Sequence, residues 1–344
     1  MPRPFLAATP AGTPAATTAT IVASIALAAC GGGGDDASGG APAEPTLAVR
    51  TAAARATAES GSNACAPIGP FYWEVGDAAG PAGSGSVSRA GGRTYLRQTP
   101  MAIASASKWL YATSVAEQRR GALTAADVRF LTLTSGYTRF DFCRTTAGGT
   151  VRDCAEAGTN GLRTPAADGR FFYGGSHMQQ HAAGDGLDAL DAPALGAELR
   201  RRLGGALSVL TYERPWVAGG ATTTPADYAA VLSGMLSGRF AMGGLLGTSS
   251  VCIDPATCPT ALFSPIRGEQ GRYSIGHFVE SDPAAGDGAY SSAGAYGFYP
   301  WIDAGKRWYG LVAREVVGDE EQGGEASMQC GRQIRAAWIG GVAR

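Results

Sequence analysis

The sequence contains one serine–lysine pair whose spacing suits covalent catalysis. Ser105 and Lys108 stand three residues apart in the segment from Ala104 to Leu110, which we predict to begin a helix that continues to Arg120. On a helix, this spacing places the hydroxyl and the amine on one face. An amine held neutral can take the proton of the hydroxyl as its oxygen attacks a carbonyl carbon. The free backbone N–H groups at the start of the helix favour the negative charge that develops in this step.

The composition of the chain strengthens the interpretation of Lys108, because a Ser-x-x-Lys pattern by itself is common on solvated helix faces. Of the 28 basic residues only two are lysines, Lys108 and Lys306, and the others are arginines. A guanidinium does not give up its proton in a protein, whereas an amine can do so. A lysine at this position therefore favours chemistry over a surface charge.

Length and charge bound the class of protein. The chain has 344 residues, of which 45% are hydrophobic and 17% are charged, and its formal net charge is −1. This is enough for a sizeable core in one large domain or two small ones. No basic excess indicates a nucleic-acid partner.

The first 30 residues have the features of an export signal. Arg3 precedes an apolar run from Ile21 to Ala29, which is too short for a permanent membrane span. The run ends in Leu-Ala-Ala-Cys-Gly, which resembles the bacterial lipobox and implies lipidation of Cys30; the alternative is an ordinary signal peptide that contains a cysteine. We predict a flexible Gly/Ala/Pro-rich tether over residues 31–62 and a folded domain over residues 63–344. The protein would then lie in the periplasm or at the cell surface, with the membrane as a partner through Cys30.

The six other cysteines form an even set, which in an exported protein indicates disulfide bonds. Proximity in the sequence favours Cys143–Cys154 and Cys252–Cys258, and it leaves Cys65 for Cys330. A metal site is not expected, because the chain has only three histidines and no Cys-x-x-Cys pair. His177 and His181 are four residues apart but have no evident third ligand or acidic partner, so we assign them, and His277, to packing.

The order of elements predicts a sheet domain interrupted by a helical insertion. We expect the insertion at about residues 121–246. Strands are predicted at 71–77, 85–88, 93–97, 273–280, 295–303 and 307–316, and helices at 125–133, 176–182, 194–203, 225–236 and 327–339. The two ends of the domain then meet in one sheet.

Several stretches in this order resemble the serine β-lactamase, penicillin-binding protein and DD-peptidase superfamily, and most of all its class C-like branch, which includes family VIII esterases and 6-aminohexanoate-dimer hydrolases. The resemblance covers about residues 70 to 340 and implies an α/β (α+β) fold with an antiparallel sheet, flanking helices and a mostly helical inserted subdomain. It rests on Ser105 to Lys108 with the following Trp109, on Phe130 to Tyr137, on Val217 to Gly220 and on Thr224 to Tyr228.

The resemblance also implies roles for the stretch that begins at Tyr173. This tyrosine stands where relatives carry Tyr-x-Asn, and a phenol near Lys108 can exist partly as phenolate and shuttle a proton between the serine and the leaving group. Gly175 stands in place of the asparagine, which in relatives holds the lysine and the substrate amide. Ser176 and His177 are the candidates to compensate for the missing amide.

The stretch from Ser291 to Phe298 stands where relatives carry Lys-Thr-Gly or His-x-Gly. Ser292 takes the position of the cation that attracts a substrate carboxylate, and Gly294 follows it. By analogy, the backbone N–H of Ala295 forms an oxyanion hole with that of Ser105. A site without the cation should favour substrates that lack a carboxylate at this point.

We therefore interpret the chain as an exported serine hydrolase that acts through an acyl-enzyme on an ester or an uncharged amide, without a metal or an organic cofactor. One alternative is a DD-peptidase or β-lactamase acting on cell-wall peptides or β-lactams, which an arginine of the insertion such as Arg214 would favour. The other is a catalytically silent lipoprotein that binds peptidoglycan. The intact set of Ser105, Lys108 and Tyr173 favours an enzyme.

Overall fold

The computed structural model describes residues 44–141, 143, 149–316 and 320–344. The predicted signal peptide, Cys30 and the tether as far as residue 43 lie outside the described residues. The described residues from Glu44 to Arg344 belong to one folded unit.

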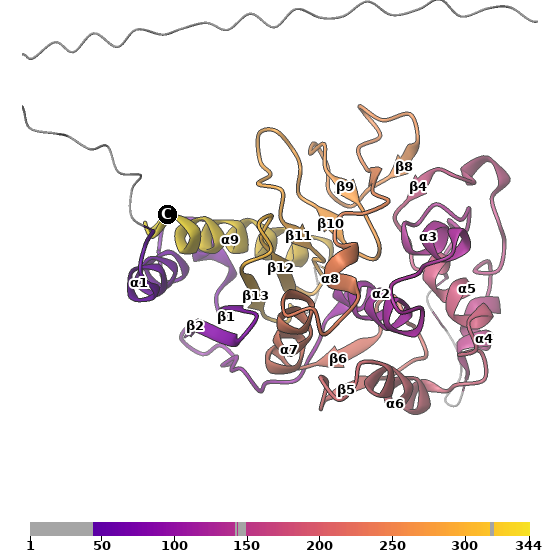
Figure 1. Ribbon diagram of the computed structural model, residues 1–344, viewed down its shortest axis with the longest axis horizontal. Helices are drawn as coiled ribbons and strands as arrows, with labels where there is room; N and C mark the ends of the chain where they lie inside the picture. Colours follow the sequence, from indigo (N-terminus) through magenta and orange to yellow (C-terminus); the bar gives the residue numbers. More distant parts are fainter. Residues whose placement is uncertain (1–43, 142, 144–148, 317–319) are drawn as a thin grey trace, which may run out of the picture. The chain divides into compact units, whose positions relative to one another are not determined.

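An eight-stranded antiparallel sheet forms the centre of this unit (Figure 1). Its strands follow in the order β2 (Gly80–Val87), β1 (Phe71–Asp77), β13 (Tyr309–Ala313), β12 (Tyr299–Ile302), β11 (Tyr290–Ser291), β10 (Phe278–Val279), β9 (Arg272–Tyr273) and β7 (Val251–Cys252). Early strand β1 pairs with late strand β13, and Glu74 lies opposite Leu311. The prediction that both ends of the domain meet in one sheet is confirmed.

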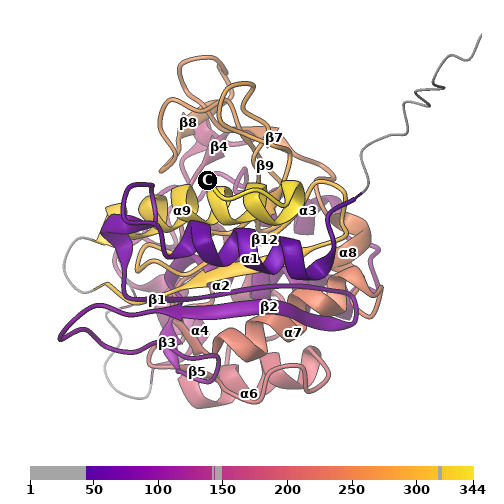
Figure 2. The ribbon, with the colours of Figure 1, turned by 90° about the vertical axis from the view of Figure 1, so that its left-hand side faces the viewer.

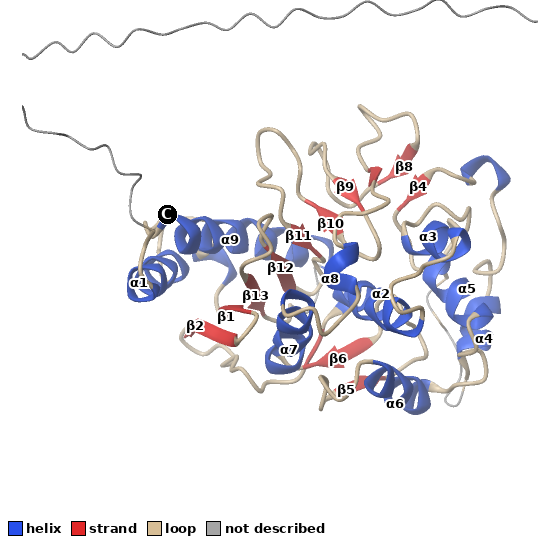
Figure 3. Ribbon diagram, viewed as in Figure 1, coloured by secondary structure: helices blue, strands red, loops and turns tan. Residues whose placement is uncertain are grey.

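Helices and two small sheets complete the unit (Figure 3). The helices are α1 (Leu47–Ala58), α2 (Ser107–Gln118), α3 (Ala125–Leu131), α4 (Val151–Glu156), α5 (Ser176–Gly184), α6 (Ala192–Arg202), α7 (Pro225–Leu236), α8 (Met242–Leu245) and α9 (Glu320–Gly340), with 3-10 turns η1 (Ala66–Ile68), η2 (Ala104–Ala106) and η3 (Pro165–Ala167). The small sheets are β3 (Met101–Ala102), β6 (Ala221–Thr223) and β5 (Leu210–Tyr212), and β4 (Phe171–Phe172) with β8 (Ala261–Phe263). The regular elements of the insertion predicted at 121–246 are mainly helices, as expected, but it also contributes β4, β5 and β6. The strand predicted at 93–97 is wrong, because this segment is a loop.

Both faces of the large sheet are buried at strands β1, β12 and β13. Along β1, Phe71 and Trp73 pack in one hydrophobic cluster with residues of α1 and α9, whereas Tyr72 between them belongs to a second cluster with residues of α2 and α7. Side chains alternate between the faces of a strand, so one strand supplies both cores. The sheet therefore carries helices on both sides, and α7 packs against β13 on the face opposite α9 (Figures 1 and 3).

The folded unit begins earlier than the sequence analysis predicts, because α1 occupies a part of the proposed tether. Helix α1 lies beside α9 (Figure 2). Ala54 is fully buried in the same cluster as Trp338, and the Arg50 guanidinium donates a 2.9 Å hydrogen bond to the Trp338 carbonyl. Alanine-rich sequence suits a tether, but alanine is also the strongest helix former, and a partner helix decides between the two outcomes. The boundary predicted at residue 63 is therefore wrong.

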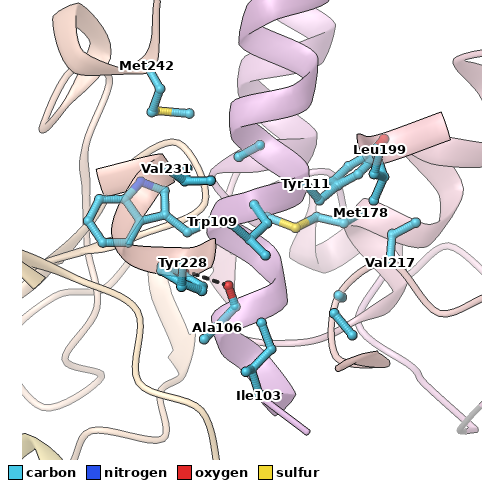
Figure 4. Close-up of a cluster of buried hydrophobic side chains, with 14 of the residues drawn as sticks. Ile103, Ala106, Trp109, Tyr111, Met178, Leu199, Val217, Tyr228, Val231 and Met242 are labelled. Carbon is cyan, nitrogen blue, oxygen red and sulfur yellow. Dashed lines mark hydrogen bonds between the residues drawn. The ribbon is translucent and has the colours of Figure 1, made fainter. Parts of the chain in front are cut away.

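Helix α2 is the centre of the larger hydrophobic cluster, and its first turn follows directly on Ser105. All residues from Ser107 to Ala116 are buried. Figure 4 shows Trp109 and Tyr111 on different sides of the helix, surrounded by side chains of α5, α6, α7 and α8. The helix therefore lies inside the protein and is buried on all sides over these residues. The Tyr228 hydroxyl of α7 donates a 2.9 Å hydrogen bond to the Ala106 carbonyl, so this rigid core also fixes the turn that carries the serine.

The structure contains the three predicted disulfide bonds, Cys65–Cys330, Cys143–Cys154 and Cys252–Cys258. The first joins the segment before β1 to α9 across 265 residues of sequence. Among the described residues, no helix has both the length and the apolar character needed to cross a bilayer.

Candidate active site

Ser105 lies in a tight turn between β3 and α2. Strand β3 pairs with β6, and the Ile103 amide donates to the Ala221 carbonyl at 3.0 Å. Ala104 has a φ of 42°, a left-handed conformation that is rare outside glycine and that turns the chain sharply into η2. Ser105 is therefore in the first helical turn, where backbone N–H groups lack an intrahelical acceptor.

Lys108 lies against Ser105, as the spacing predicts. Its Nζ donates hydrogen bonds of 2.9 Å to Ser105 Oγ and 3.0 Å to the Ala218 carbonyl oxygen. The side chain is buried, and this burial lowers the pKa of the amine to about 7. A large share of the amine is therefore neutral near neutral pH, as a general base requires.

Tyr173 completes the group, but it does so as a neutral phenol. Its hydroxyl forms a hydrogen bond with Ser105, and its ring centroid lies 4.7 Å from Lys108 Nζ. Burial raises the pKa of this phenol to about 12. The partial phenolate expected from the sequence is therefore wrong, because burial disfavours the anion more than the hydrogen bond with Ser105 favours it. The amine, and not the phenol, is the group poised to accept a proton.

A hydrogen bond also fixes the backbone of Tyr173. Its amide donates to the Phe263 carbonyl at 3.0 Å, beside the pairing of β4 with β8. Its ring stacks on that of Phe278, with centroids 5.4 Å apart. A segment some 90 residues later in the sequence therefore holds the phenol in place. No sequence motif predicts that this segment contacts Tyr173.

A cavity of about 370 Å³ opens on this group of side chains. Ser105, Lys108, Tyr173, Gly175 and Ala295 line it, as the sequence analysis predicts. The residues that the sequence analysis missed are mostly aromatic or apolar: Phe140, Trp216, Phe263, Ile266, Phe278 and Met328. Only Trp216 had a signal, because it directly precedes the recognised stretch at Val217. Two charged and exposed side chains, Arg267 and Glu325, lie on the rim of the cavity.

Three predicted substrate-binding residues do not line the cavity. The Ser292 hydroxyl donates to the backbone carbonyl of Ser105 at 3.3 Å. The Ser176 hydroxyl donates to the Arg139 carbonyl and does not replace the missing asparagine. A side chain at Gly294 would meet the Ile103 carbonyl at 2.1 Å, so this glycine allows close packing under the serine turn. Ser292 and Gly294 therefore pack against the turn that contains Ser105, and Ser176 holds the segment at Arg139, next to the cavity residue Phe140.

The histidines are structural, although the reason differs from the one that the sequence suggested. His181 Nε2 lies 2.8 Å from Asp127, so the statement that it has no acidic partner is wrong. His177 accepts at Nδ1 from the Ser135 hydroxyl at 2.8 Å and donates from Nε2 to the Phe172 carbonyl, and burial lowers its pKa to about 3. Within the described ranges, no cluster of three or more His, Cys, Asp or Glu side chains is arranged to hold a metal ion.

Comparisons with known proteins identify the fold. No protein-family model matches the sequence, and no curated protein matches it. A structural match to a candidate β-lactamase from Bacteroides dorei has a TM-score of 0.55 at 19% identity and covers 78% of this chain and 94% of that chain. The D-amino acid amidase from Ochrobactrum anthropi gives 0.54 at 11% identity, covering 78% and 95%.

A third match is the penicillin-binding protein from Bacillus halodurans, with a TM-score of 0.51, 13% identity, and coverage of 77% of this chain and 95% of that chain. At such identities the likeness concerns the fold, and in each case it extends over nearly the whole of the other chain. It agrees with the resemblance seen in the order of the sequence stretches. The chain therefore has the fold of the serine β-lactamase and penicillin-binding protein superfamily.

Proposed function

We propose that this protein is a serine hydrolase that forms an acyl-enzyme on Ser105 with an ester or an uncharged amide. The observation that carries the proposal is the 2.9 Å contact between Ser105 Oγ and a buried amine whose pKa is about 7. Tyr173 bonds to the same serine, and all three side chains line one cavity. A silent binding protein would have no need of an amine whose pKa is shifted in this way.

The reaction follows from these contacts. Ser105 Oγ attacks the carbonyl carbon and its proton passes to Lys108 Nζ, while the backbone N–H groups of Ser105 and Ala295 bind the oxyanion. The ammonium returns the proton to the leaving oxygen or nitrogen through the Tyr173 hydroxyl, and the bond to the leaving group breaks. Water then attacks the acyl-enzyme and gives a proton to Lys108, which passes it to Ser105 Oγ as the bond from the acyl carbon to this oxygen breaks, so that the acid and the free serine are released.

The charge of the cavity favours neutral substrates. Ser292 adds no charge near Ser105 and does not line the cavity, and the rim of the cavity carries one cation and one anion, Arg267 and Glu325. One observation favours the alternative, a DD-peptidase or β-lactamase. Arg267 lines the cavity, which Arg214 does not, and its guanidinium could bind a substrate carboxylate. Glu325 on the same cavity opposes such a substrate by like-charge repulsion.

A comparison of two substrates tests the proposal. We expect the purified domain from Glu44 onward to hydrolyse short p-nitrophenyl esters with saturation kinetics, and to turn over the cephalosporin nitrocefin slowly or not at all. A fluorophosphonate should phosphonylate the protein once, on the peptide that contains Ser105. Rapid turnover of nitrocefin with an inert ester would reverse the order of the two candidate functions, and a folded protein that neither labels nor hydrolyses either substrate would exclude both.

Replacing Tyr173 by phenylalanine tests the path of the proton. We expect kcat to fall by about 10²-fold for an alkyl ester, because the alkoxide needs a proton from the phenol as it leaves. The loss should be much smaller for a p-nitrophenyl ester, since p-nitrophenolate leaves without a proton. The ring contact with Phe278 remains, so the fold should not change. Equal losses for both esters would show that the hydroxyl only positions Ser105.

A further inference from the structure

Gly175 is a glycine because of its neighbours and not because of its backbone. It precedes α5 with φ −83° and ψ −28°, a right-handed conformation open to any residue. A Cβ built on it would lie 3.0 Å from Trp216 Nε1 and 3.3 Å from Cδ1 and Cε1 of Phe140. Two aromatic rings therefore take the space into which a side chain at this position would extend.

These two residues, Phe140 and Trp216, form what we call the aromatic wall of the cavity. Their ring centroids lie 5.0 Å apart with an interplanar angle of 32°. Both line the cavity next to Tyr173 and Gly175. The wall thus replaces a polar side chain with apolar surface on the side of the cavity next to the catalytic group.

The chain holds Trp216 in place from both sides. The buried Gln179 side chain of α5 donates to the Pro215 carbonyl at 2.9 Å and accepts from the Val217 amide at 3.2 Å. A Cβ on Gly219 would meet the indole at 2.5 Å, so the ring packs directly on this glycine. A ring that is fixed in this way is a preorganised surface, which lowers the cost of binding a flat group.

We propose that the aromatic wall is a subsite for an aromatic acyl group, and that the enzyme accordingly prefers esters of aryl-substituted acids to acetyl esters. This inference rests on the proposed function and names its substrate class. Buried Phe278 and Met328 continue the apolar surface, on which a polar amide would lose its hydrogen bonds to water. Arg267 and Glu325 lie on the exposed rim, which suits the leaving alcohol, whereas the acyl group stays bound to Ser105 until water releases it.

A series of esters tests this inference. The p-nitrophenyl esters of acetate and phenylacetate are compared, with each kcat/KM divided by the rate constant for hydrolysis by hydroxide. We expect the wild type to prefer phenylacetate by about 10- to 100-fold. Trp216→Ala should lower the value for phenylacetate by about tenfold and that for acetate by less than about threefold, while Trp216→Phe should keep most of the preference.

A second series of esters tests whether the aromatic wall contacts the acyl group or the alcohol of the substrate. For acetate esters of alcohols of increasing size, kcat/KM should change with alcohol size in the same way in the wild type and in Trp216→Ala. If this variant changes selection among alcohols and not among acids, the assignment to the acyl group is wrong. Equal normalised rates for both acids in the wild type would also overturn it, as would equal losses for both acids in a folded Trp216→Ala protein.

Gly175→Ala provides an independent test if Trp216→Ala does not fold. The added methyl group has to push the indole by a few tenths of an ångström, and we expect it to reduce the preference for phenylacetate while acetate is still hydrolysed. An unchanged preference in folded Gly175→Ala would contradict the inference. Hydrolysis without an acyl preference would overturn this inference alone, whereas a wild type that neither hydrolyses esters nor labels on Ser105 would overturn the proposed function itself.

Discussion

Ser105→Ala should abolish labelling by a fluorophosphonate and lower kcat for p-nitrophenyl esters by about 10⁴-fold or more. The reason is that neighbouring hydroxyls are already committed to structural hydrogen bonds. Ser107 Oγ donates to the Ala104 carbonyl at 2.6 Å and accepts from the Ala221 amide at 3.2 Å, and Ser292 Oγ donates to the Ser105 carbonyl. Neither hydroxyl can replace that of Ser105 without losing hydrogen bonds that hold the turn at Ser105.

Ser107→Ala is the matched control, since it removes a hydroxyl two residues away that has no role in the proposed chemistry. We expect this variant to be labelled on the Ser105 peptide, even if the lost hydrogen bonds reduce its thermal stability. Intact protein mass and peptide mapping after labelling measure both outcomes. Stoichiometric labelling of folded Ser105→Ala protein, with an unchanged rate of hydrolysis, would place the nucleophile elsewhere in the chain.

The proposed catalytic group could be predicted from the sequence in part, because two of its residues lie close together in the chain. Ser105 and Lys108 share one helical turn, so their spacing alone predicts their contact. Tyr173 was placed by the order of the recognised stretches and not by any spacing. Its pKa was beyond prediction, because it depends on how completely the fold removes the phenol from water.

The walls of the cavity could not be predicted in the same way. Phe263 and Phe278 reach the site only through the pairing of β4 with β8 and through the large sheet, and these contacts join distant parts of the sequence. Ser292 and Ser176 lie at sequence positions that predict contact with a substrate, yet their hydroxyls donate to backbone carbonyls. Which way a short polar side chain points depends on acceptors that only the folded chain supplies.

The start of the domain shows the same limit. The alanines and the few apolar residues of α1 give a weak amphipathic pattern, and such a segment is a helix only where a partner covers it. Helix α9 provides that partner, and Arg50 binds the carbonyl oxygens of Trp338 and Ile339 at its end. The sequence of residues 47–58 alone does not predict a contact with residues almost 300 positions later in the chain.

Lys108→Met should lower kcat/KM for esters by about 10³-fold, because methionine fills the same space without a group that can accept a proton. Lys306→Met is the matched control. Lys306 is the other lysine of the chain, it is exposed, and it does not line the cavity, so its loss should leave the rate unchanged. Lys108→Arg adds a second comparison, since a guanidinium keeps the positive charge but cannot serve as a base, and it should be as inactive as the methionine variant.

The pH profile of the wild type then separates a base from a fixed charge at Lys108. Burial lowers the pKa of this amine to about 7, so the neutral form that accepts the serine proton increases as the pH rises through that value. We expect kcat/KM to increase about tenfold per pH unit on the acidic side and to level off on the alkaline side of the midpoint. If the ammonium acted only by attracting a substrate, the rate would instead fall as the pH rose through the same midpoint. A falling profile, or an activity of Lys108→Arg close to that of the wild type, would therefore exclude Lys108 as the base.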